Sequence, residues 1–576
     1  MNHSAAVKTA GVAALPPLRA QALSALLLLG LCVLVGRAVY LQGIHDTFLQ
    51  REGDARYGRV VNIVAHRGMI TDRYGEPLAV STPVESVWAS PQDADMTKEQ
   101  INQLARALDM KAGDIQKKLS GASRDFVYLK RQLPPEQAEK VMQMEAPGVS
   151  LRREYRRYYP AGEMTAQLLG FTDVDDNGQE GLELAMQSVL GGQAGSQRVI
   201  KDRRGRIVED VASLRAPKPG NDLALSLDSK VQYLAFREIK QVVEQYRAKS
   251  GAIVVLDAKT GEVLALANWP SYNPNNRAKP QPQALRNRAV TDAFEPGSTM
   301  KTFTVAAALD AGKVKPASVI DTGDGVLTVG GRKIHDTHPE PRLSVAQVLQ
   351  VSSNVGAAKM ALSMSPETFW NNLHDAGFGM PTNSGFPGET AGVLRDHRKW
   401  VPIDQATISY GNGISVNLLQ LARAYTIFAN DGELLPVTFY RQEAAPAGKR
   451  VFSVATARAV RGMLEKVVQS GGTAPQAQVN GYRVAGKTGT AHKLEGGRYV
   501  NRYVASFVGM APASNPRLIV AVMVDDPAGA QYYGGQVAAP AFSNVMGAAL
   551  RLLNVPNDAP LNKPSTVPVT AVREET

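Results

Sequence analysis

Cysteine is almost absent from this chain of 576 residues, since Cys32 is the only one. One thiol can form no intramolecular disulfide, so the folded parts must be stable through their apolar cores alone. The apolar content of 44% and the charged content of 20% are ordinary for a globular protein. The length is sufficient for two or more domains of the usual size.

Acidic residues are also absent, in this case from the first 45 positions. Residues 22–41 form an apolar run that Arg37 alone interrupts, and as a helix of 20 residues it would span about 30 Å, a bilayer core. The preceding Lys8 and Arg19 predict a cytoplasmic N-terminus, residues 1–21. No small-x-small site follows the run, and the large Leu31 precedes Cys32, which argues against a signal peptide and a lipoprotein. We expect one uncleaved transmembrane anchor.

The net charge of +11 is spread along the chain, so it is weak evidence for nucleic acid, and anionic lipid or an acidic polymer would serve as well. We expect no nucleic-acid partner. The anchor places everything after residue 41 outside the cytoplasm, in a compartment without ATP. We therefore expect no nucleotide and no other cofactor.

The exported part reads as two modules and a tail. Residues 42–224 mix short strands such as 59–64 with helical stretches such as 98–108, and they contain no catalytic constellation, which favours a scaffold. The breaker 217–220 (PKPG) precedes a second module at 225–556. There we predict helices at 230–246, 302–311 and 418–429, two buried strands within 251–268, and a strand at 518–524. Residues 557–576 lack core periodicity and should be disordered.

One stretch, GYRVAGKTGTAHK at residues 481–493, fits two motifs. It matches the phosphate loop G-x-x-x-x-G-K-[ST], and it contains the Lys-Thr-Gly of penicillin-recognising serine enzymes. A phosphate loop requires a helix directly after Lys-Thr, and Gly489, Gly496 and Gly497 make that helix untenable. A second Lys-Thr-Gly, at 259–261, lies between two predicted strands, where Gly261 would supply a hairpin turn.

Upstream, FEPGSTMKTF at residues 294–303 places Ser298 and Lys301 three residues apart at a predicted helix start. This spacing puts both side chains on one helix face. A serine hydroxyl needs a base to become a nucleophile, and a lysine can be that base when burial and neighbouring cations lower its pKa. The pair alone is a weak signal, because Ser and Lys are common residues.

Two later segments strengthen it. In Ser352-Ser353-Asn354, the first serine could relay a proton and Asn354 could bind a substrate amide. In Lys487-Thr488-Gly489-Thr490, an extended strand would put both threonine hydroxyls on one face, where they could hold a carboxylate. Gly489 would let a substrate lie against that strand. We predict an active site from Ser298, Lys301, Ser352 and Lys487, with Asn354, Thr488, Gly489 and Thr490 binding substrate.

These three motifs, in this order, resemble those of class B penicillin-binding proteins, closest to the division-specific members of Gram-negative bacteria. Further segments carry the resemblance: 65–79 (AHRGMITDRYGEPLA), 155–163 (YRRYYPAGE), 170–183 (GFTDVDDNGQEGLE), 271–276 (SYNPNN) and 286–301 (RNRAVTDAFEPGSTMK). The resemblance implies an α/β (α+β) transpeptidase fold, with a five-stranded antiparallel sheet covered by helices. It also implies an elongated mixed α+β pedestal of the dimerisation type at 42–224.

By that resemblance, Ser298 attacks the D-Ala-D-Ala bond of a pentapeptide stem and passes the acyl group to an amine on a neighbouring stem. Lys301 would be the base, Ser352 and Lys487 the proton route to the leaving group, and Asn354 would orient the peptide. Backbone N–H groups of Ser298 and Thr490 would form the oxyanion hole. β-Lactams would acylate the same serine.

The resemblance also implies partners and a location. Nothing at residues 42–224 resembles a glycosyltransferase, so polymerisation should come from a membrane glycan polymerase of the FtsW type, alongside other divisome proteins. The chain would sit in the bacterial inner membrane with a periplasmic catalytic domain, at the division septum. One departure is Asn412 in Tyr410-Gly411-Asn412-Gly413, where such proteins often carry an aromatic ring. That departure keeps open a condition-specific paralogue with a different β-lactam preference.

Other interpretations remain at this stage. A D,D-carboxypeptidase or β-lactamase would share Ser298, although no carboxylate that delivers water can be assigned. A non-catalytic penicillin sensor would need signalling machinery, for which 21 residues before the anchor leave no room. His335 and His338 lack a third ligand, so we expect no metal and a loop at both positions. His492, after the Lys-Thr-Gly-Thr strand, could line the cleft.

Overall fold

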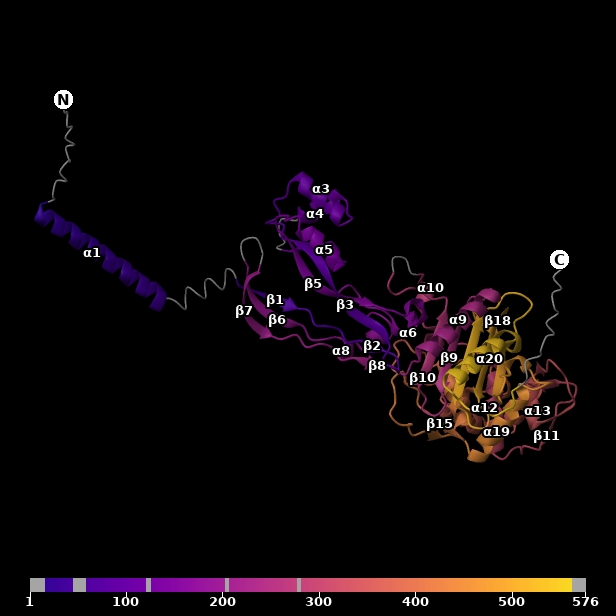
Figure 1. Ribbon diagram of the computed structural model, residues 1–576. Coiled ribbons are helices and arrows are strands. Elements are labelled where there is room, and N and C mark those ends of the chain that lie inside the picture. Colours follow the sequence, from indigo (N-terminus) through magenta and orange to yellow (C-terminus); the bar gives the residue numbers. More distant parts are fainter. Residues whose placement is uncertain (1–15, 45–57, 121–125, 202–206, 277–280, 562–576) are drawn as a thin grey trace, which may run out of the picture. The chain divides into compact units, whose positions relative to one another are not determined.

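The computed structural model describes residues 16–44, 58–120, 126–201, 207–276 and 281–561. Its elements fall into two compact units, which alternate along the chain (Figure 1). The first unit holds residues 1–64, 84–154 and 194–218, and the second holds 65–83, 155–193 and 219–576. The segment expected to form one pedestal, residues 42–224, therefore contributes to both units.

The N-terminal helix α1, Pro17–Val39, continues into one π-helical stretch at Tyr40–Ile44. None of its side chains is buried, and the leucines at 26–29 expose about two thirds of their surface. Among the described residues it is the one helix long and apolar enough to cross a membrane. The predicted run at 22–41 lies inside it, as expected for a single-pass anchor.

The first unit contains two small assemblies. One is an antiparallel sheet in the order β1-β6-β7: Gly58–Ile63, Gly195–Lys201 and Ile207–Arg215. The other is a separate apolar core in which the end of β3, Pro77–Ala89, pairs with β4, Val127–Leu133. Three helices pack on it: α3 Lys98–Ala107, α4 Ala112–Leu119 and α5 Pro135–Met142. The strand predicted at 59–64 and the helix predicted at 98–108 are confirmed.

The second unit is built on the expected five-stranded antiparallel sheet, in the order β10-β9-β19-β18-β17. Its strands are β9 Ser250–Asp257, β10 Val263–Trp269, β17 Ala485–Glu495, β18 Arg498–Ala511 and β19 Leu518–Asp525. Every residue of β9 is buried, which explains its continuous apolar sequence. This order places β17, which carries the Lys-Thr-Gly at 487–489, at one edge of the sheet.

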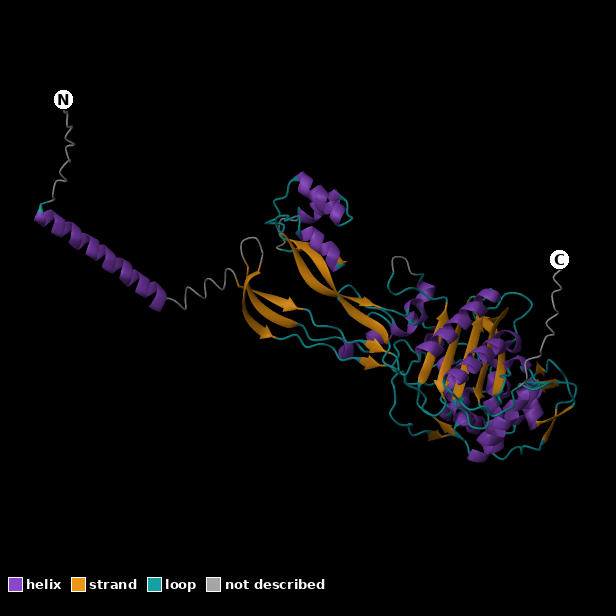
Figure 2. Ribbon diagram, in the orientation of Figure 1, coloured by secondary structure: helices purple, strands orange, loops and turns teal. Residues whose placement is uncertain are grey.

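Helices cover this sheet. The helices α9 Ser229–Gln245 and α20 Gly534–Leu552 pack against each other and against the strands (Figures 1 and 2), and further contacts come from α17 Leu418–Ala424 and α19 Val454–Val467. The helices predicted at 230–246 and 302–311 are confirmed as α9 and α12, Lys301–Asp310. The helix predicted at 418–429 is instead two, because it breaks at Tyr425 between α17 and α18, Thr426–Ala429.

Smaller elements complete the second unit. The strand β2, Ile70–Thr71, pairs with the start of β3 (Pro77–Ala89) and with β8, Leu223–Ala224. A hairpin of β12 Val326–Val329 and β13 Arg332–His335 leads through α13 Val345–Gln350 to α14 Asn354–Leu362. His335 therefore ends a strand, where a loop was expected.

The start of the C-terminal tail also differs from the expectation. Asp558 accepts hydrogen bonds from Arg483 N at 2.7 Å and from Ser514 Oγ at 2.7 Å, which fixes residues near 558 on the second unit. Residues 562–576 lie outside the described residues.

Candidate active site

The turn before α12 positions Ser298. Residues Gly297–Met300 form one turn of 3-10 helix, which Gly297 enters with φ of +55°. A Cβ on Gly297 would lie 3.1 Å from Thr490 O, so this turn packs against the backbone of β17. Gly297 N also donates to Gly411 O at 3.3 Å. Ser298 is therefore held between the edge strand and the 410–413 turn.

Two lysines meet at one hydroxyl beside Ser298. Lys301 Nζ donates to Ser352 Oγ at 3.1 Å and to Ser352 O at 2.5 Å, and Lys487 Nζ donates to the same Oγ at 3.0 Å. Both lysine side chains are fully buried. Three groups that the sequence places far apart thus form one chain of hydrogen bonds, Lys301–Ser352–Lys487. Among the described residues, none forms a hydrogen bond with Ser298 Oγ.

The electrostatics of this lysine pair favour neutral amines. Burial lowers the pKa of Lys301 well below its ordinary value, the Lys487 charge lowers it further, and Asp336 opposes both effects. Burial also lowers the pKa of Lys487, to about 7. A lysine whose pKa lies near neutrality is able to take a proton from a serine hydroxyl at physiological pH.

Asp336 fixes the second segment, and sequence reasoning missed it. Its carboxylate accepts from Ser353 Oγ at 2.6 Å, Asn354 N at 2.5 Å and Val355 N at 2.9 Å, so it caps the start of α14. Ser352, just before this cap, has φ of +62°, a costly conformation for a serine. Asp336 directly follows His335 in the sequence, but it reaches the start of α14 only because the β12–β13 hairpin folds there.

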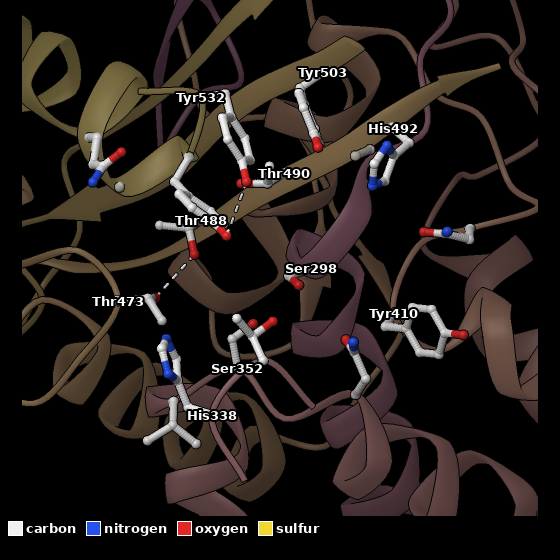
Figure 3. Close-up of a pocket in the computed structure, with 18 residues that line it drawn as sticks. Ser298, His338, Ser352, Tyr410, Thr473, Thr488, Thr490, His492, Tyr503 and Tyr532 are labelled. Atoms are coloured by element: carbon white, nitrogen blue, oxygen red, sulfur yellow. Dashed lines mark hydrogen bonds between the residues drawn. The ribbon is translucent and has the colours of Figure 1, made fainter. Parts of the chain in front are cut away.

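Three of the four substrate-binding residues predicted from sequence, Asn354, Thr488 and Thr490, line one cleft of about 570 Å³ together with Ser298 and Ser352 (Figure 3), whereas Gly489 does not line it. Asn354 is held there by donating from Nδ2 to His335 O at 2.9 Å. Thr488 Oγ1 lies 3.0 Å from Thr473 Oγ1 and accepts from Lys487 Nζ at 3.2 Å. Thr490 Oγ1 accepts from Gly534 N at 3.0 Å. Both threonines lie on the same side of β17, as period two predicts.

Glycine is required at position 489 for a different reason from the one expected. A Cβ at this position would lie 2.3 Å from Ser506 Oγ and 2.6 Å from Pro296 O, both of which are protein atoms. The position therefore faces the interior, on the side of the strand opposite Thr488 and Thr490. The absence of a side chain lets the Ser298 turn approach β17, rather than letting a substrate do so.

Aromatic rings form one wall of the cleft, and sequence reasoning named only one of them. Tyr503 and Tyr532 stack with centroids 4.0 Å apart, and His492 packs on Tyr503 at 4.5 Å (Figure 3). Tyr533 continues the stack at 4.6 Å from Tyr532. His492 lines the cleft, as expected. In a chain with 6% aromatic residues, Tyr532-Tyr533 before Gly534-Gly535 was the available signal. His338, Tyr410 and Asn412 line the cleft as well.

The other Lys-Thr-Gly has no part in this cleft. Residues 259–261 form the turn between β9 and β10, as predicted. Gly261 has φ of +72°, and a Cβ there would lie 1.9 Å from Pro436 O. Thr260 Oγ1 donates to Glu262 Oε2 at 3.0 Å.

Comparison with known proteins gives consistent matches. Residues 251–547 match the family model described as "Penicillin binding protein transpeptidase domain", and residues 62–225 match "Penicillin-binding Protein dimerisation domain". The chain is 44% identical to "Probable peptidoglycan D,D-transpeptidase PenA" of Neisseria meningitidis, over 92% of this chain and 91% of the relative. It is 42% identical to "Peptidoglycan D,D-transpeptidase FtsI" of Escherichia coli K12, over the same shares.

Among solved structures, the transpeptidase (TP) domain of Burkholderia pseudomallei penicillin-binding protein 3 is similar. It superimposes with a TM-score of 0.55 at 50% sequence identity, and the match covers 58% of this chain and 98% of that domain.

Proposed function

The chain belongs to the penicillin-binding proteins, and from that premise we propose that it is a peptidoglycan D,D-transpeptidase with Ser298 as its nucleophile. Its substrates are peptidoglycan stem peptides, and β-lactams bind the same site. The observation that carries the role of Ser298 is the buried pair of lysines joined through Ser352 Oγ beside it. In such a pair, burial and mutual repulsion supply neutral amines without any further base.

In the first half of the reaction, Lys301 takes the proton of Ser298, and Oγ forms a bond to the carbonyl carbon of the penultimate D-Ala. The peptide C–N bond then breaks, and the leaving D-Ala amine receives a proton along Lys487 and Ser352. Thr488 and Thr490 hold the terminal carboxylate, and Asn354 orients the peptide. The backbone N–H groups of Ser298 and Thr490 stabilise the oxyanion.

The test is labelling of the full-length chain with fluorescent penicillin. We expect a stable adduct that the Ser298→Ala variant lacks, and peptide mapping that finds the label on Ser298. Label on another serine would overturn the site. Rapid loss of label from the wild type would favour a β-lactamase. Absence of any label would exclude both enzymatic interpretations and leave a scaffold.

We further propose that the enzyme acts at the division septum, anchored by α1 with residues 1–21 in the cytoplasm and the catalytic unit in the periplasm. The similarity to a relative named FtsI supports this, as do Lys8 and Arg19, which precede the apolar run at 22–41. A membrane glycan polymerase of the FtsW type would supply the glycan, with other divisome proteins as partners.

Depletion combined with a fluorescent fusion tests the septal role. Filamentation with septal fluorescence is the expected result, and rounding of the cells would indicate an elongation enzyme instead. Asn412 in the cleft wall favours a second candidate, a condition-specific paralogue, for which depletion in ordinary medium would give no phenotype.

A further inference from the structure

The cleft is expected to bind a carboxylate, yet its wall carries no permanently charged side chain. Among the 18 residues that line it there is no lysine, arginine, aspartate or glutamate. The lining residues of the type that becomes cationic in mild acid are His338 and His492. At neutral pH, the terminal carboxylate of a donor stem at Thr488 and Thr490 would therefore meet hydroxyl groups and no fixed cation on the wall.

The two lysines behind this wall supply only part of the missing charge. Lys301 and Lys487 are fully buried, and burial lowers the pKa of each, in the case of Lys487 to about 7. Lys487 Nζ also donates to Ser352 Oγ at 3.0 Å and to Thr488 Oγ1 at 3.2 Å. The role of Lys301 as the base requires a neutral amine, so the pair cannot be both the proton acceptor and a full counter-charge for the carboxylate.

The two histidines lie on opposite sides of Ser298 (Figure 3). His338 points toward Thr473, whose Oγ1 lies 3.0 Å from Thr488 Oγ1. His492 packs instead on the tyrosine wall at the other side. His338 is therefore the histidine beside the threonines that are predicted to hold the carboxylate.

The charged neighbours of His338 on its own segment are directed elsewhere. Asp336 is buried, and its carboxylate accepts hydrogen bonds from Ser353 Oγ and from two backbone N–H groups at the start of α14. His335 and Glu340 are exposed and do not line the cleft. Within the described part of the chain, no hydrogen bond or ion pair involves the His338 side chain. Its imidazole is thus available to a ligand in the cleft.

We propose that His338, as an imidazolium, pairs with the terminal carboxylate of the donor stem peptide at Thr488 and Thr490, so that the donor binds more tightly in mild acid. This inference rests on the proposed function and assigns a specificity-determining residue to it. An α-carboxyl group titrates near pH 3.5, roughly, so the carboxylate stays ionised while histidine gains its charge. The carboxylate belongs to the D-Ala that leaves, whose amine receives its proton along Lys487 and Ser352, so His338 acts on donor capture and not on the acyl group.

The experiment measures donor binding apart from catalysis, in the full-length Ser298→Ala chain in detergent, which cannot be acylated. A stem pentapeptide ending in D-Ala-D-Ala and its C-terminal amide are titrated by calorimetry at pH 5.5 and pH 8. Lys487 also gains charge in this range, so the quantity of interest is the part of the pH preference that His338→Gln removes. We expect that variant to lower the preference of the acid peptide for pH 5.5 by about 3- to 10-fold, and to leave the amide unchanged.

Matched controls are available in the same chain. His335→Gln changes an exposed histidine three residues away that does not line the cleft, and His492→Gln removes the histidine on the other side of it. Both should keep the pH preference of the parent chain. His338→Arg carries its charge at both pH values, so it should bind the acid peptide at pH 8 about as tightly as the parent chain does at pH 5.5. Loss of the preference in His492→Gln but not in His338→Gln would overturn the proposal.

Penicillin labelling of the chain with Ser298 intact separates this proposal from the function on which it rests. Label on Ser298 together with an unchanged pH preference in His338→Gln would contradict the role of His338 alone. Equal pH preferences for the acid and the amide would do the same, because the carboxylate would then not be the partner. No binding of the acid peptide at either pH would overturn the role of His338, and absence of label on Ser298 as well would overturn the transpeptidase assignment.

Discussion

The tripeptide Lys259-Thr260-Gly261 lies in the turn between β9 and β10, and the same tripeptide at Lys487-Thr488-Gly489 lies inside β17. In the turn, Lys259 is half-buried and Gly261 has positive φ. In the strand, Lys487 is fully buried and bonded to Ser352, and Gly489 receives the Ser298 turn. Because the three residues are the same at both places, the chemistry belongs to the edge of the sheet and to the segments that pack on it.

The largest difference should appear when each lysine is replaced. Lys487→Met removes one amine from the hydrogen-bonded chain Lys301–Ser352–Lys487 beside Ser298, so we expect penicillin acylation to slow by about 10³-fold, within the usual range for an acid–base group. Lys259→Met should change the rate by less than twofold. Stopped-flow or quenched labelling of both variants measures this. Similar losses in the two would show that the lysines act through folding rather than chemistry.

The two glycines should differ in the kind of damage that a methyl group causes. Gly489→Ala would push against Pro296 O and Ser506 Oγ, displace the Ser298 turn, and slow acylation by about 10- to 100-fold. Gly261→Ala would strain a left-handed turn against Pro436 O and lower the free energy of unfolding by about 1–3 kcal/mol. Acylation rates and thermal melts of both variants separate these outcomes. If Gly261→Ala acylated more slowly without any loss of stability, the purely structural role of the 259–261 turn would be contradicted.

The buried lysine should also leave a signature in the pH dependence of stability. Native Lys487 has a pKa of about 7, below its ordinary value, so between pH 7 and pH 10 the unfolded chain holds one more proton than the folded chain. Stability in that window therefore rises with pH by about 1.4 kcal/mol per unit from this residue alone. Lys487→Met removes the slope. The melting temperatures of the wild type at pH 7, 8 and 9 should approach those of the variant as the pH rises. A constant difference between the two melting temperatures would refute a neutral buried lysine.

The smallest effect concerns the acidic residues beside Lys301 in the cleft and Lys259 in the turn. Asp336 holds the pKa of Lys301 up, and Asp431 does the same for Lys259. Asp336→Asn should therefore lower the pKa of Lys301 further, and the acid limb of the acylation rate should move to lower pH because the amine stays neutral there. Asp431→Asn should leave that limb unchanged. A loss of rate at all pH values without a shift would mean that Asp336 only caps α14.

The local sequence pattern was sufficient to predict much of the fold and of the candidate site. The continuous apolar run at 518–524 could only be a buried strand, and it is β19; the apolar run near the N-terminus is α1. Ser298 and Lys301 were predicted from one shared motif, and Ser352 and Lys487 from one further motif each. Their roles in the reaction stay predictions until the labelling is done.

What the pattern could not predict depends on contacts between distant segments. Asp336 matters because a hairpin brings it to the start of α14, and Tyr503, Tyr532 and Tyr533 form a wall only after β18 and the start of α20 meet. The expected reason for glycine at position 489, room for a substrate, was wrong because it also depends on a contact between distant segments. The period of two gives the two faces of a strand, but it does not tell which face packs against the protein. The helix also breaks at Tyr425, whose buried hydroxyl is hydrogen-bonded to Thr302 and Thr299, and helical periodicity alone does not reveal such long-range contacts.

The contact between Gly297 and Gly411 restricts how this enzyme can change. Gly411 has φ of +90°, and a Cβ on it would lie 2.1 Å from Gly297 O, so any side chain there would push on the turn that carries Ser298. Tyr410 and Asn412, on either side, line the cleft. The side chains at positions 410 and 412 can therefore change in size and polarity without pushing on the turn that carries Ser298, whereas position 411 must stay glycine.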